Sequence, residues 1–556
     1  MTLEKIADKV VETDVLVIGG GIAGCPAAAK AKEHGLNVTL VEKAKIDRSG
    51  SAAQGIDHYG GAYPRGMTPQ EWVANCQSYG PGAFYGGAPY SDPTRIYRQY
   101  ANGLWAIEEL EKLGVTMRWD DGELRPCDCH HEGPFLRVHW QNVKPEMAAG
   151  VRKRGVNVLE RTLAVNLLTN KGAVVGATAV NTRTGEFIVI KAKATVIATA
   201  ACSRVYNPET PVPWKYKFRY HWCPASVSGD GWAMAYGAGA ELVNMEQAGR
   251  GYRFRDDLVL SFGNWGNEGI VAKRLTWDGE EFVRRNLTEM ERKGKDPFYF
   301  SLEHLPDDFH KRIEVAYVDE RLVSFKIAED RGFNPRTHWY EMMEARPNQL
   351  HCPPGINADA DFKASVKGLY AIGDCVAGCH DVANAATAGF LVGDSIHTFV
   401  SEAGEPVVDE AQVESQKQVA LTPLAVKDGT EPMELECAIR YICDRYVGLH
   451  KAEGKLLEGQ RRLRSLRREF LPKLMAKNPH YLMRCLEVRN MMDVAELHIQ
   501  ACLERRETRG DSIRLDYPER NPSWDDLLTY QRLKDGKAVF EMRKPAPLNM
   551  EFKEER

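Results

Sequence analysis

The feature that most constrains the fold is a glycine-rich turn near the N-terminus, within the segment TDVLVIGGGIAGCPAAAK from Thr13 to Lys30. The short apolar run from Val15 to Ile18 is typical of a buried parallel strand. Gly19, Gly21 and Gly24 then form the pattern G-x-G-x-x-G, and an alanine-rich segment follows. These residues predict a strand, a tight turn and a helix that packs closely on the strand.

Each glycine has its own role in a dinucleotide site. Gly19 permits the tight turn, Gly21 lets the backbone approach a pyrophosphate, and Gly24 lets the helix touch the strand. The segment LNVTLV predicts a second strand that leads into Glu42, 18 residues beyond Gly24, at the distance where an acid reaches a ribose hydroxyl. The phosphates would lie at a helix N-terminus, which favours anions. A dinucleotide site is therefore the preferred interpretation, and a glycine-rich turn in an ordinary α/β unit is the alternative.

The composition excludes several classes of protein. A chain of 556 residues is long enough for two to four domains, and its 43% apolar and 27% charged residues are ordinary for a soluble protein. A formal net charge of −4 gives no support for nucleic-acid binding. No apolar run of about 18 residues predicts a membrane-spanning helix. The N-terminal MTLEKIADKVVE lacks the apolar core of a signal peptide, so we expect a cytoplasmic protein without membrane insertion.

The cysteines do not form a cluster motif. There are 13, and none of the close pairs has the C-x₂-C spacing of a zinc site or the cysteine run of a ferredoxin. We therefore expect no metal site and reduced, buried thiols. If the protein handles single electrons through iron–sulfur clusters, those clusters belong to another chain.

The first two thirds of the chain predict an α/β fold. Helical periodicity covers Asp92 to Gly114 and Trp140 to Val151. Val156 to Ala200 predicts strands in a meander beside the parallel sheet, with a turn at Thr182–Gly185 and with GEFIVIKA and ATVIATA as separate strands. LYAIGD predicts a further strand that ends in Asp374.

The last third has a different character. Residues 405–432 are polar and contain proline, which indicates a linker. Residues 434–508 are helical in pattern and highly charged, which predicts a bundle of about three helices. The tail at residues 511–556 is predicted to be extended.

Motifs along most of the chain together resemble the flavoprotein subunits of the succinate dehydrogenase, fumarate reductase and adenylylsulfate reductase family. They are GGGIAG with Glu42 and Lys43, RSGSAAQG, KGLYAIGDC, VRNMMDVAEL and ERRETRGDSIRLDYPERN. RSGSAAQG and KGLYAIGDC look most like the alpha subunit of adenylylsulfate reductase. The resemblance implies a Rossmann-like FAD-binding domain (1–200 and 350–404), an inserted α+β capping domain (201–349), and a C-terminal helical domain with an extended tail (433–556).

The resemblance also implies an FAD site. Gly50 stands where the succinate and fumarate enzymes usually carry a histidine that bonds covalently to the flavin, so FAD is expected to be noncovalent. The family commonly has A-T-G-G where this chain has Ala198, Thr199, Ala200 and Ala201, and an alanine fits there if its φ is negative. The expected FAD contacts are Gly19, Gly21, Ile22, Ala23 and Gly24 of the pyrophosphate loop, Glu42 and Lys43 at the adenosine end, Ser49, Gly50, Ser51, Gln54 and Gly55 against the flavin, and Thr199 and Asp374.

Candidate catalytic residues follow from the same resemblance. His351 in LHCPPGIN matches a segment that places an active-site histidine at the flavin face, and His58 follows the flavin loop. Lys273, with Arg274 as an equal candidate, lies near the place of a proton-donating arginine in fumarate reductases. Arg253 and Arg255 are candidate clamps for an anionic substrate group. Ordinary surface or core roles are the alternative for each residue.

The expected function is that of an FAD-bearing catalytic subunit. Its FAD exchanges two electrons with a small anionic substrate, and a ferredoxin-like iron–sulfur partner in a hetero-oligomer relays single electrons. Adenylylsulfate or a related sulfur oxyanion is the leading substrate, although Gly60 replaces an asparagine of that enzyme. DVANAATAGFLVGD lacks the arginine that holds a dicarboxylate in fumarate reductases. An enoate or dicarboxylate reductase and a noncatalytic FAD electron-transfer subunit remain alternatives.

Overall fold

The computed structural model describes most of the chain. The described residues are 2–54, 56–60, 68–77, 91–126, 135–140, 142–206, 224, 226–251, 273–282, 286–308, 310–311, 329–334, 336–341, 346–350, 354–378, 381–509 and 512–549.

A seven-stranded mixed sheet forms the centre of the molecule. Its strands lie in the order β6-β2-β1-β9-β8-β7, and β18 pairs with β9. The pairs β6–β2, β2–β1, β1–β9 and β9–β18 are parallel, whereas β7–β8 and β8–β9 are antiparallel, as the predicted meander requires. The strands are β1 (Lys9–Ile18), β2 (Val38–Glu42), β6 (Asn157–Glu160), β7 (Thr162–Asn170), β8 (Ala173–Asn181), β9 (Phe187–Ile197) and β18 (Leu369–Ala371).

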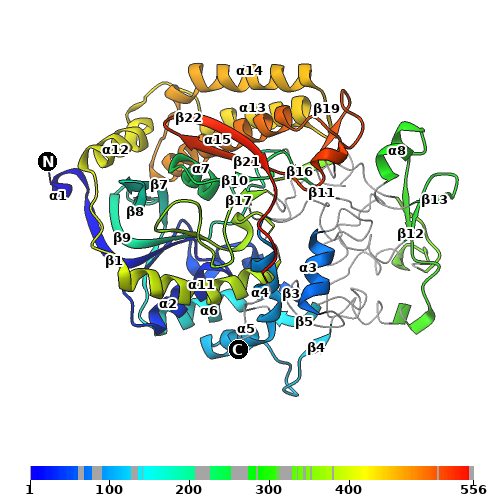
Figure 1. The fold of residues 1–556 in the computed structure, drawn as a ribbon, viewed down its shortest axis with the longest axis horizontal. Helices are drawn as coiled ribbons and strands as arrows, with labels where there is room; N and C mark the ends of the chain where they lie inside the picture. Colours follow the sequence, from blue (N-terminus) through cyan, green and yellow to red (C-terminus); the bar gives the residue numbers. More distant parts are fainter. Residues whose placement is uncertain are drawn as a thin grey trace.

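Alternate residues of β1 face two separate hydrophobic cores. Val15 and Val17 pack with helices on one face of the sheet, whereas Leu16 and Ile18 pack into the core on the other face. Figure 1 shows α2, α6 and α11 below the sheet and the C-terminal helices above it. The helices of the first face are α2 (Gly24–Glu33), α5 (Gly103–Leu113), α6 (Val143–Lys153) and α11 (Val382–Glu402).

Two predicted elements differ in extent. The two strands expected between Gly185 and Ala200 are one strand, β9, which pairs with β8 in its first half and with β1 throughout. The helix expected from Asp92 to Gly114 is broken at Asn102 into α4 (Pro93–Ala101) and α5. Asn102 has φ −101° and ψ 12°, and its Nδ2 donates to the Arg98 carbonyl at 2.8 Å, which ends α4.

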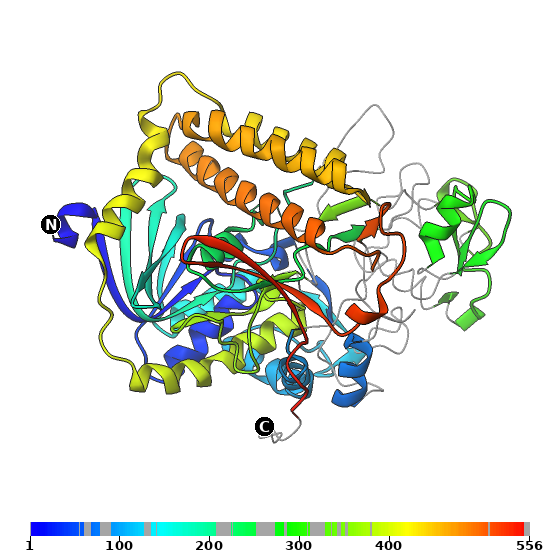
Figure 2. The same cartoon turned by 45° about the horizontal axis from the view of Figure 1, so that its top comes forward.

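The polar segment expected to be a linker contains a helix, α12 (Glu410–Ala425). Its glutamines hydrogen-bond the sheet, since Gln412 Nε2 donates to Thr169 Oγ1 at 3.0 Å and Gln416 Nε2 to the Leu167 carbonyl at 3.0 Å. Three helices follow, as predicted: α13 (Pro432–Ile442), α14 (Glu453–Glu469) and α15 (Pro479–Glu504). Figure 2 shows α14 and α15 side by side.

The C-terminal tail, predicted to be extended, contains a β-hairpin. β21 (Leu528–Lys534) and β22 (Lys537–Arg543) pair through a two-residue turn at Asp535 and Gly536. Both turn residues have positive φ, 50° and 73°, which is the backbone of a type I′ hairpin turn. β21 also pairs with β10 (Leu242–Val243), which in turn pairs with β17 (Gly355–Ile356), so the tail is fixed to the body of the protein.

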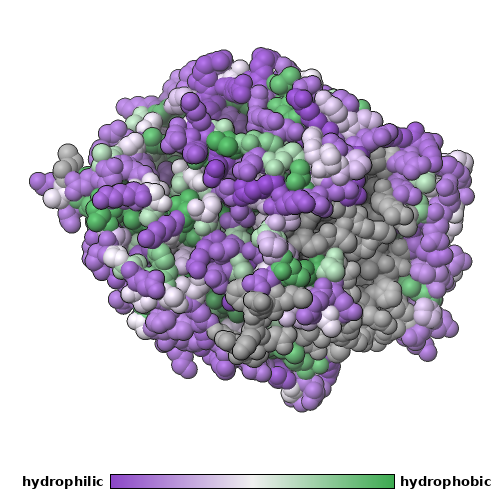
Figure 3. Space-filling view, in the orientation of Figure 1, coloured by the Kyte–Doolittle hydropathy of each residue, from purple (hydrophilic) through white to green (hydrophobic). Residues whose placement is uncertain are grey.

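The remaining elements are short and lie mainly around the expected capping region. A four-stranded sheet, β13-β12-β14-β15, lies with α8 at the right of Figure 1. None of the described helices is long and apolar enough to cross a membrane, and the described surface in Figure 3 is mostly hydrophilic. These elements, with the first helix, are α1 (Leu3–Ile6), β3 (Ile56–Gly60), α3 (Pro69–Gln77), β4 (Arg125–Pro126), β5 (Phe135–Trp140), α7 (Asp230–Gly237), β11 (Gly249–Gly251), β12 (Lys273–Leu275), β13 (Glu281–Phe282), α8 (Leu287–Arg292), β14 (Tyr299–Ser301), β15 (Tyr340–Glu341), β16 (Arg346–Gln349), β19 (His450–Lys451) and β20 (Ile513–Arg514).

A buried ion network joins the sheet to the C-terminal helices. Glu487 of α15 accepts from Lys43 Nζ at 2.9 Å and from Arg204 at 2.6 Å. Burial raises the pKa of the Glu487 carboxyl, but Lys43, Arg204 and Arg484 outweigh it and hold the pKa at about 2. The members of this network are Lys43, Arg204, Asp230, Glu436, Arg440, Arg484 and Glu487.

Removing the Glu487 charge is expected to destabilise the protein strongly. Glu487→Gln leaves the cations of Lys43 and Arg204 buried without one partner, which costs roughly 3–5 kcal/mol of unfolding free energy. Because the carboxyl has a depressed pKa in the folded state, its contribution is present above pH 4.5 and is lost as the pH falls toward 2. Chemical denaturation from about pH 6 to about pH 2 measures both effects, because this range spans the window in which the contribution is lost.

Glu458→Gln on α14 is the matched control. Glu458 also pairs with two arginines, Arg461 and Arg462, but on the surface of the helix. Solvent screens such a pair, so this variant should unfold close to the wild-type midpoint. Equal losses of unfolding free energy in Glu487→Gln and Glu458→Gln would contradict a special role for the buried network.

Candidate functional site

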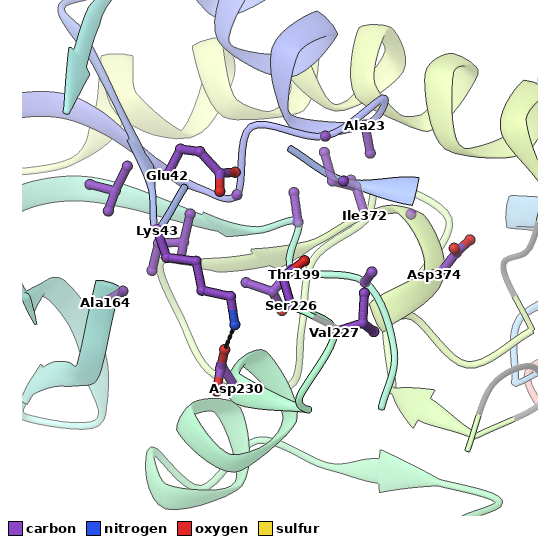
Figure 4. Close-up of a pocket in the computed structure, with 18 of the residues that line it drawn as sticks. Ala23, Glu42, Lys43, Ala164, Thr199, Ser226, Val227, Asp230, Ile372 and Asp374 are labelled. Carbon is purple, nitrogen blue, oxygen red and sulfur yellow. Dashed lines mark hydrogen bonds and ion pairs between the residues drawn. The ribbon is translucent and has the colours of Figure 1, made fainter. Parts of the chain in front are cut away.

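The carboxyl ends of four parallel strands meet at one pocket. Gly19 follows β1, Glu42 ends β2, Ala198 follows β9, and Ile372 follows β18. Ligands of open parallel sheets bind at such edges. Figure 4 shows Glu42 and Lys43 on one side of the pocket and Asp374 on the other. Ten predicted FAD contacts line it: Gly19, Gly21, Ile22, Ala23, Glu42, Lys43, Gly50, Ser51, Thr199 and Asp374.

The surroundings of the three fingerprint glycines differ from one another. Gly19 has φ 107°, and a Cβ there would lie 2.3 Å from the Ala198 carbonyl oxygen. A Cβ on Gly24 would lie 1.9 Å from the carbonyl oxygen of Gly19, so α2 approaches β1 only because residue 24 has no side chain. A Cβ on Gly21 would meet no heavy atom within 4 Å, so this residue presents bare backbone to the pocket.

Glu42 and Lys43 are held in different ways. The Glu42 carboxylate accepts from the amide N–H groups of Gly20 and Ala44, both at 2.8 Å. Lys43 Nζ donates to Asp230 at 2.6 Å, the contact drawn in Figure 4, and to Glu487. Burial lowers the pKa of Lys43, but Asp230 and Glu487 outweigh burial and raise the pKa above its ordinary value. Lys43 therefore lies at the pocket wall as a paired cation.

Sequence reasoning missed part of the pocket wall. Asp230 begins α7, and Ser226 and Val227 precede it, nearly 190 residues beyond Lys43 in the chain. The triplet Gly229–Asp230–Gly231 is the one local signal, since Gly229 has φ 83° and is the N-cap residue of α7. Thr162 to Ala164 of β7 also line the pocket.

The pocket carries polar groups that fit a bound dinucleotide. Ser51 Oγ and Thr199 Oγ1 are buried at its wall and have no hydrogen-bond partner within the described structure. A buried hydroxyl without a partner is costly, and a polar ligand in the pocket would offer these two groups hydrogen-bond partners. The N-terminus of α2, whose N-cap residue Ala23 lines the pocket, carries the positive end of the helix dipole and no acidic residue in its first turn. The hydroxyl groups and the bare glycine backbone therefore fit the FAD that the sequence resemblance implies.

Ala200 departs from the expectation for its backbone. Its φ is +59°, in the left-handed region, rather than the negative value that would suit alanine. The family's usual glycine would adopt this conformation without strain. Ala200 lines the pocket, so the strain lies at the ligand site.

The other predicted site residues are placed less directly. Ser49 is buried next to the pocket without lining it, and the backbones of Gln54 and His58 lie in a 3₁₀ turn and in β3. Lys273 lies in β12, where its half-exposed ammonium pairs with Glu281 at 2.8 Å. Gly55, His351, Arg253 and Arg255 lie outside the described residues.

Replacing Ala200 by glycine is expected to stabilise the protein. The variant removes a left-handed alanine, and the gain exceeds the entropy cost of glycine by roughly 0.5–1 kcal/mol. The matched control is Ala201→Gly, because Ala201 is buried and has no positive φ. Thermal unfolding should give a raised midpoint for Ala200→Gly and a lowered one for Ala201→Gly; a lowered midpoint for both would contradict the assigned strain.

Comparisons with known proteins identify the family. The FAD binding domain model matches residues 14–391, and the fumarate reductase flavoprotein C-terminal model matches residues 438–553. One subunit of the fumarate reductase (CoM/CoB) of Methanothermobacter marburgensis is 24% identical over 94% of this chain and 97% of its own. The L-aspartate oxidase of Streptomyces coelicolor is 24% identical over 92% of this chain and 90% of its own.

A solved structure shares the fold along almost the whole chain. It is adenosine-5-phosphosulfate reductase in complex with sulfite as a covalent adduct, with a TM-score of 0.81 and 24% identity over 97% of this chain and 96% of that chain. The family match covers more than half of the sequence, including every strand end that forms the pocket. The chain therefore belongs to the family of FAD-dependent oxidoreductases that includes the flavoprotein subunits of succinate dehydrogenase, fumarate reductase and adenylylsulfate reductase.

Proposed function

We propose that this chain is the catalytic subunit of an oxidoreductase complex that acts on a small anionic substrate of the adenylylsulfate or sulfur-oxyanion type. FAD, when bound, supplies the exchange of two electrons with the substrate and of single electrons with an iron–sulfur partner chain. The observation that carries the choice of substrate is the composition of α11. From Val382 to Glu402 this helix contains no lysine or arginine.

The absence of a cation on α11 argues against a dicarboxylate. Fumarate reductases are expected to hold one substrate carboxylate with an arginine in the matching segment, and a guanidinium fork is a strong carboxylate ligand. Here Ala385 of α11 lines the pocket beside Gly373 and Asp374. A substrate with a second carboxylate would find no partner on this helix.

Gly50 supports noncovalent attachment of the cofactor. Its φ is +77°, and a Cβ there would lie 3.1 Å from the Cα of Gly21. A histidine at this position would need a strained backbone and would press on the glycine loop. Residue 50 therefore has no side chain that could form the covalent link found in succinate and fumarate enzymes.

The roles of the chemistry-bearing residues rest on their sequence motifs. We assign Arg253 and Arg255 to binding of the anionic group and His351 to proton transfer at the substrate, with His58 next to the flavin loop. Lys273 is a weaker candidate, because it is half-exposed and paired with Glu281. We assign the iron–sulfur clusters to a partner chain, because the cysteine spacing of this chain provides no cluster motif.

A second candidate is a fumarate-type reductase. It is favoured by the similarity to the fumarate reductase (CoM/CoB) subunit, which extends over 94% of the chain. The same experiment separates the two functions.

The test is reoxidation of the photoreduced, FAD-loaded chain by candidate anions under anaerobic conditions. Adenylylsulfate should restore the oxidised flavin spectrum, whereas fumarate should not. His351→Ala should slow this step by roughly 100-fold or more, the usual contribution of a proton-transferring group, with unchanged FAD content.

His480→Ala is the control, because His480 is an exposed histidine of α15. Reoxidation by fumarate alone would establish the second candidate. If no anion reoxidises the flavin, even with the iron–sulfur partner present, the chain is not the catalytic subunit.

A further inference from the structure

A buried ammonium group lies behind the glycine-rich loop. Lys144 is the second residue of α6 and is 1% exposed. Its Nζ donates to the carbonyl of Gly20 and lies 3.8 Å from the Sγ of Cys25. The Cys25 thiol donates to the same carbonyl at 3.2 Å. The Gly20 carbonyl, in the centre of the loop, is therefore held by a cation that does not itself line the pocket.

The charge of Lys144 has no carboxylate partner in the part of the chain that the structure describes. Glu42 reaches Gly20 from its N–H side, but its two oxygens accept from the amide groups of Gly20 and Ala44. Lys144 also lies in the first turn of α6, where the helix dipole disfavours a cation. A buried charge without a partner of opposite charge is costly, and a bound anion would offset this cost.

We propose that Lys144 is a positioning residue for the pyrophosphate of FAD. Its charge is balanced by the bound diphosphate rather than by a protein carboxylate, and its hydrogen bond fixes the Gly20 peptide in the loop that receives the phosphates. The same loop presents Gly19 and Gly21 to the pocket. This inference does not depend on the identity of the substrate, so failure of the proposed reaction would leave it standing.

The proposal makes opposite predictions for the empty and the loaded protein. In the FAD-free chain the buried charge of Lys144 destabilises the folded state, so Lys144→Met should keep or raise the thermal unfolding midpoint. In the loaded chain the same variant should weaken the binding of FAD at least tenfold, which corresponds to about 1.4 kcal/mol of binding free energy. A residue that only fills space would lower the stability of both forms.

The experiment uses the full-length chain after removal of FAD, with ADP and adenosine as probes in calorimetric titrations. Lys144→Met should weaken ADP about as much as it weakens FAD and should leave adenosine, which has no phosphate, unchanged. Lys153→Met, an exposed lysine of the same helix, is the matched control and should change none of these values.

Lys144→Gln separates the charge from the hydrogen bond, because its amide still donates to Gly20. Weaker ADP binding in this variant, with unchanged adenosine binding, would show that the charge of Lys144 is needed. The same measurement tests the proposal if Lys144→Met does not fold. Three outcomes would overturn the proposal: wild-type ADP affinity in either neutral variant, equal loss of ADP and adenosine binding, or failure of both neutral variants to fold.

Discussion

The close approach of α2 to the end of β1 is the constraint on which the site depends. At Gly24 the helix lies against the carbonyl of Gly19, at a distance that no side chain could occupy. The same helix is approached from its other side by α11, where a Cβ on Gly389 would lie 2.3 Å from the Ala23 carbonyl oxygen. These contacts between small residues bring the phosphate loop, the N-terminal part of α11 and the turn at Asp374 to one pocket.

Charge is distributed around this pocket by elements far apart in the chain. Glu42 is held by backbone amides, Lys43 is paired with Asp230, and Glu487 ties Lys43 to the C-terminal helices. The pocket wall at Lys43 is therefore completed by α7 and supported by α15. Since the buried charge of Lys43 is compensated by Asp230 and Glu487 together, the C-terminal helices support the pocket wall at Lys43.

Local patterns predict much of the fold and of the cofactor site. The strand, turn and helix around Gly19, the meander after Val156, and the three C-terminal helices follow from periodicity and from the special conformations of glycine. The hairpin at Asp535–Gly536 is not among the predicted elements, although an Asp-Gly pair between alternating residues is its usual signal. The helix at Glu410–Ala425 resembles a linker in sequence, because it has no clear apolar stripe. It contacts the sheet through hydrogen bonds of its glutamines instead.

Long-range contacts cannot be predicted in the same way. Nothing near Asp230 or Lys144 in the sequence indicates that the first pairs with Lys43 and the second reaches Gly20, because only the folded topology brings these residues together. The positive φ of Ala200 is likewise imposed by its surroundings against its own preference.

The central claim is that the glycine loop holds FAD without a covalent bond. Its most direct test is the flavin released by acid precipitation from the wild-type chain, from Gly24→Ala and from Gly454→Ala, whose added Cβ would meet no atom within 4 Å. The wild type and Gly454→Ala should release about one FAD per chain into the supernatant. Gly24→Ala should release almost none. Flavin retained in the pellet, or full FAD content in Gly24→Ala, would contradict noncovalent binding by this loop.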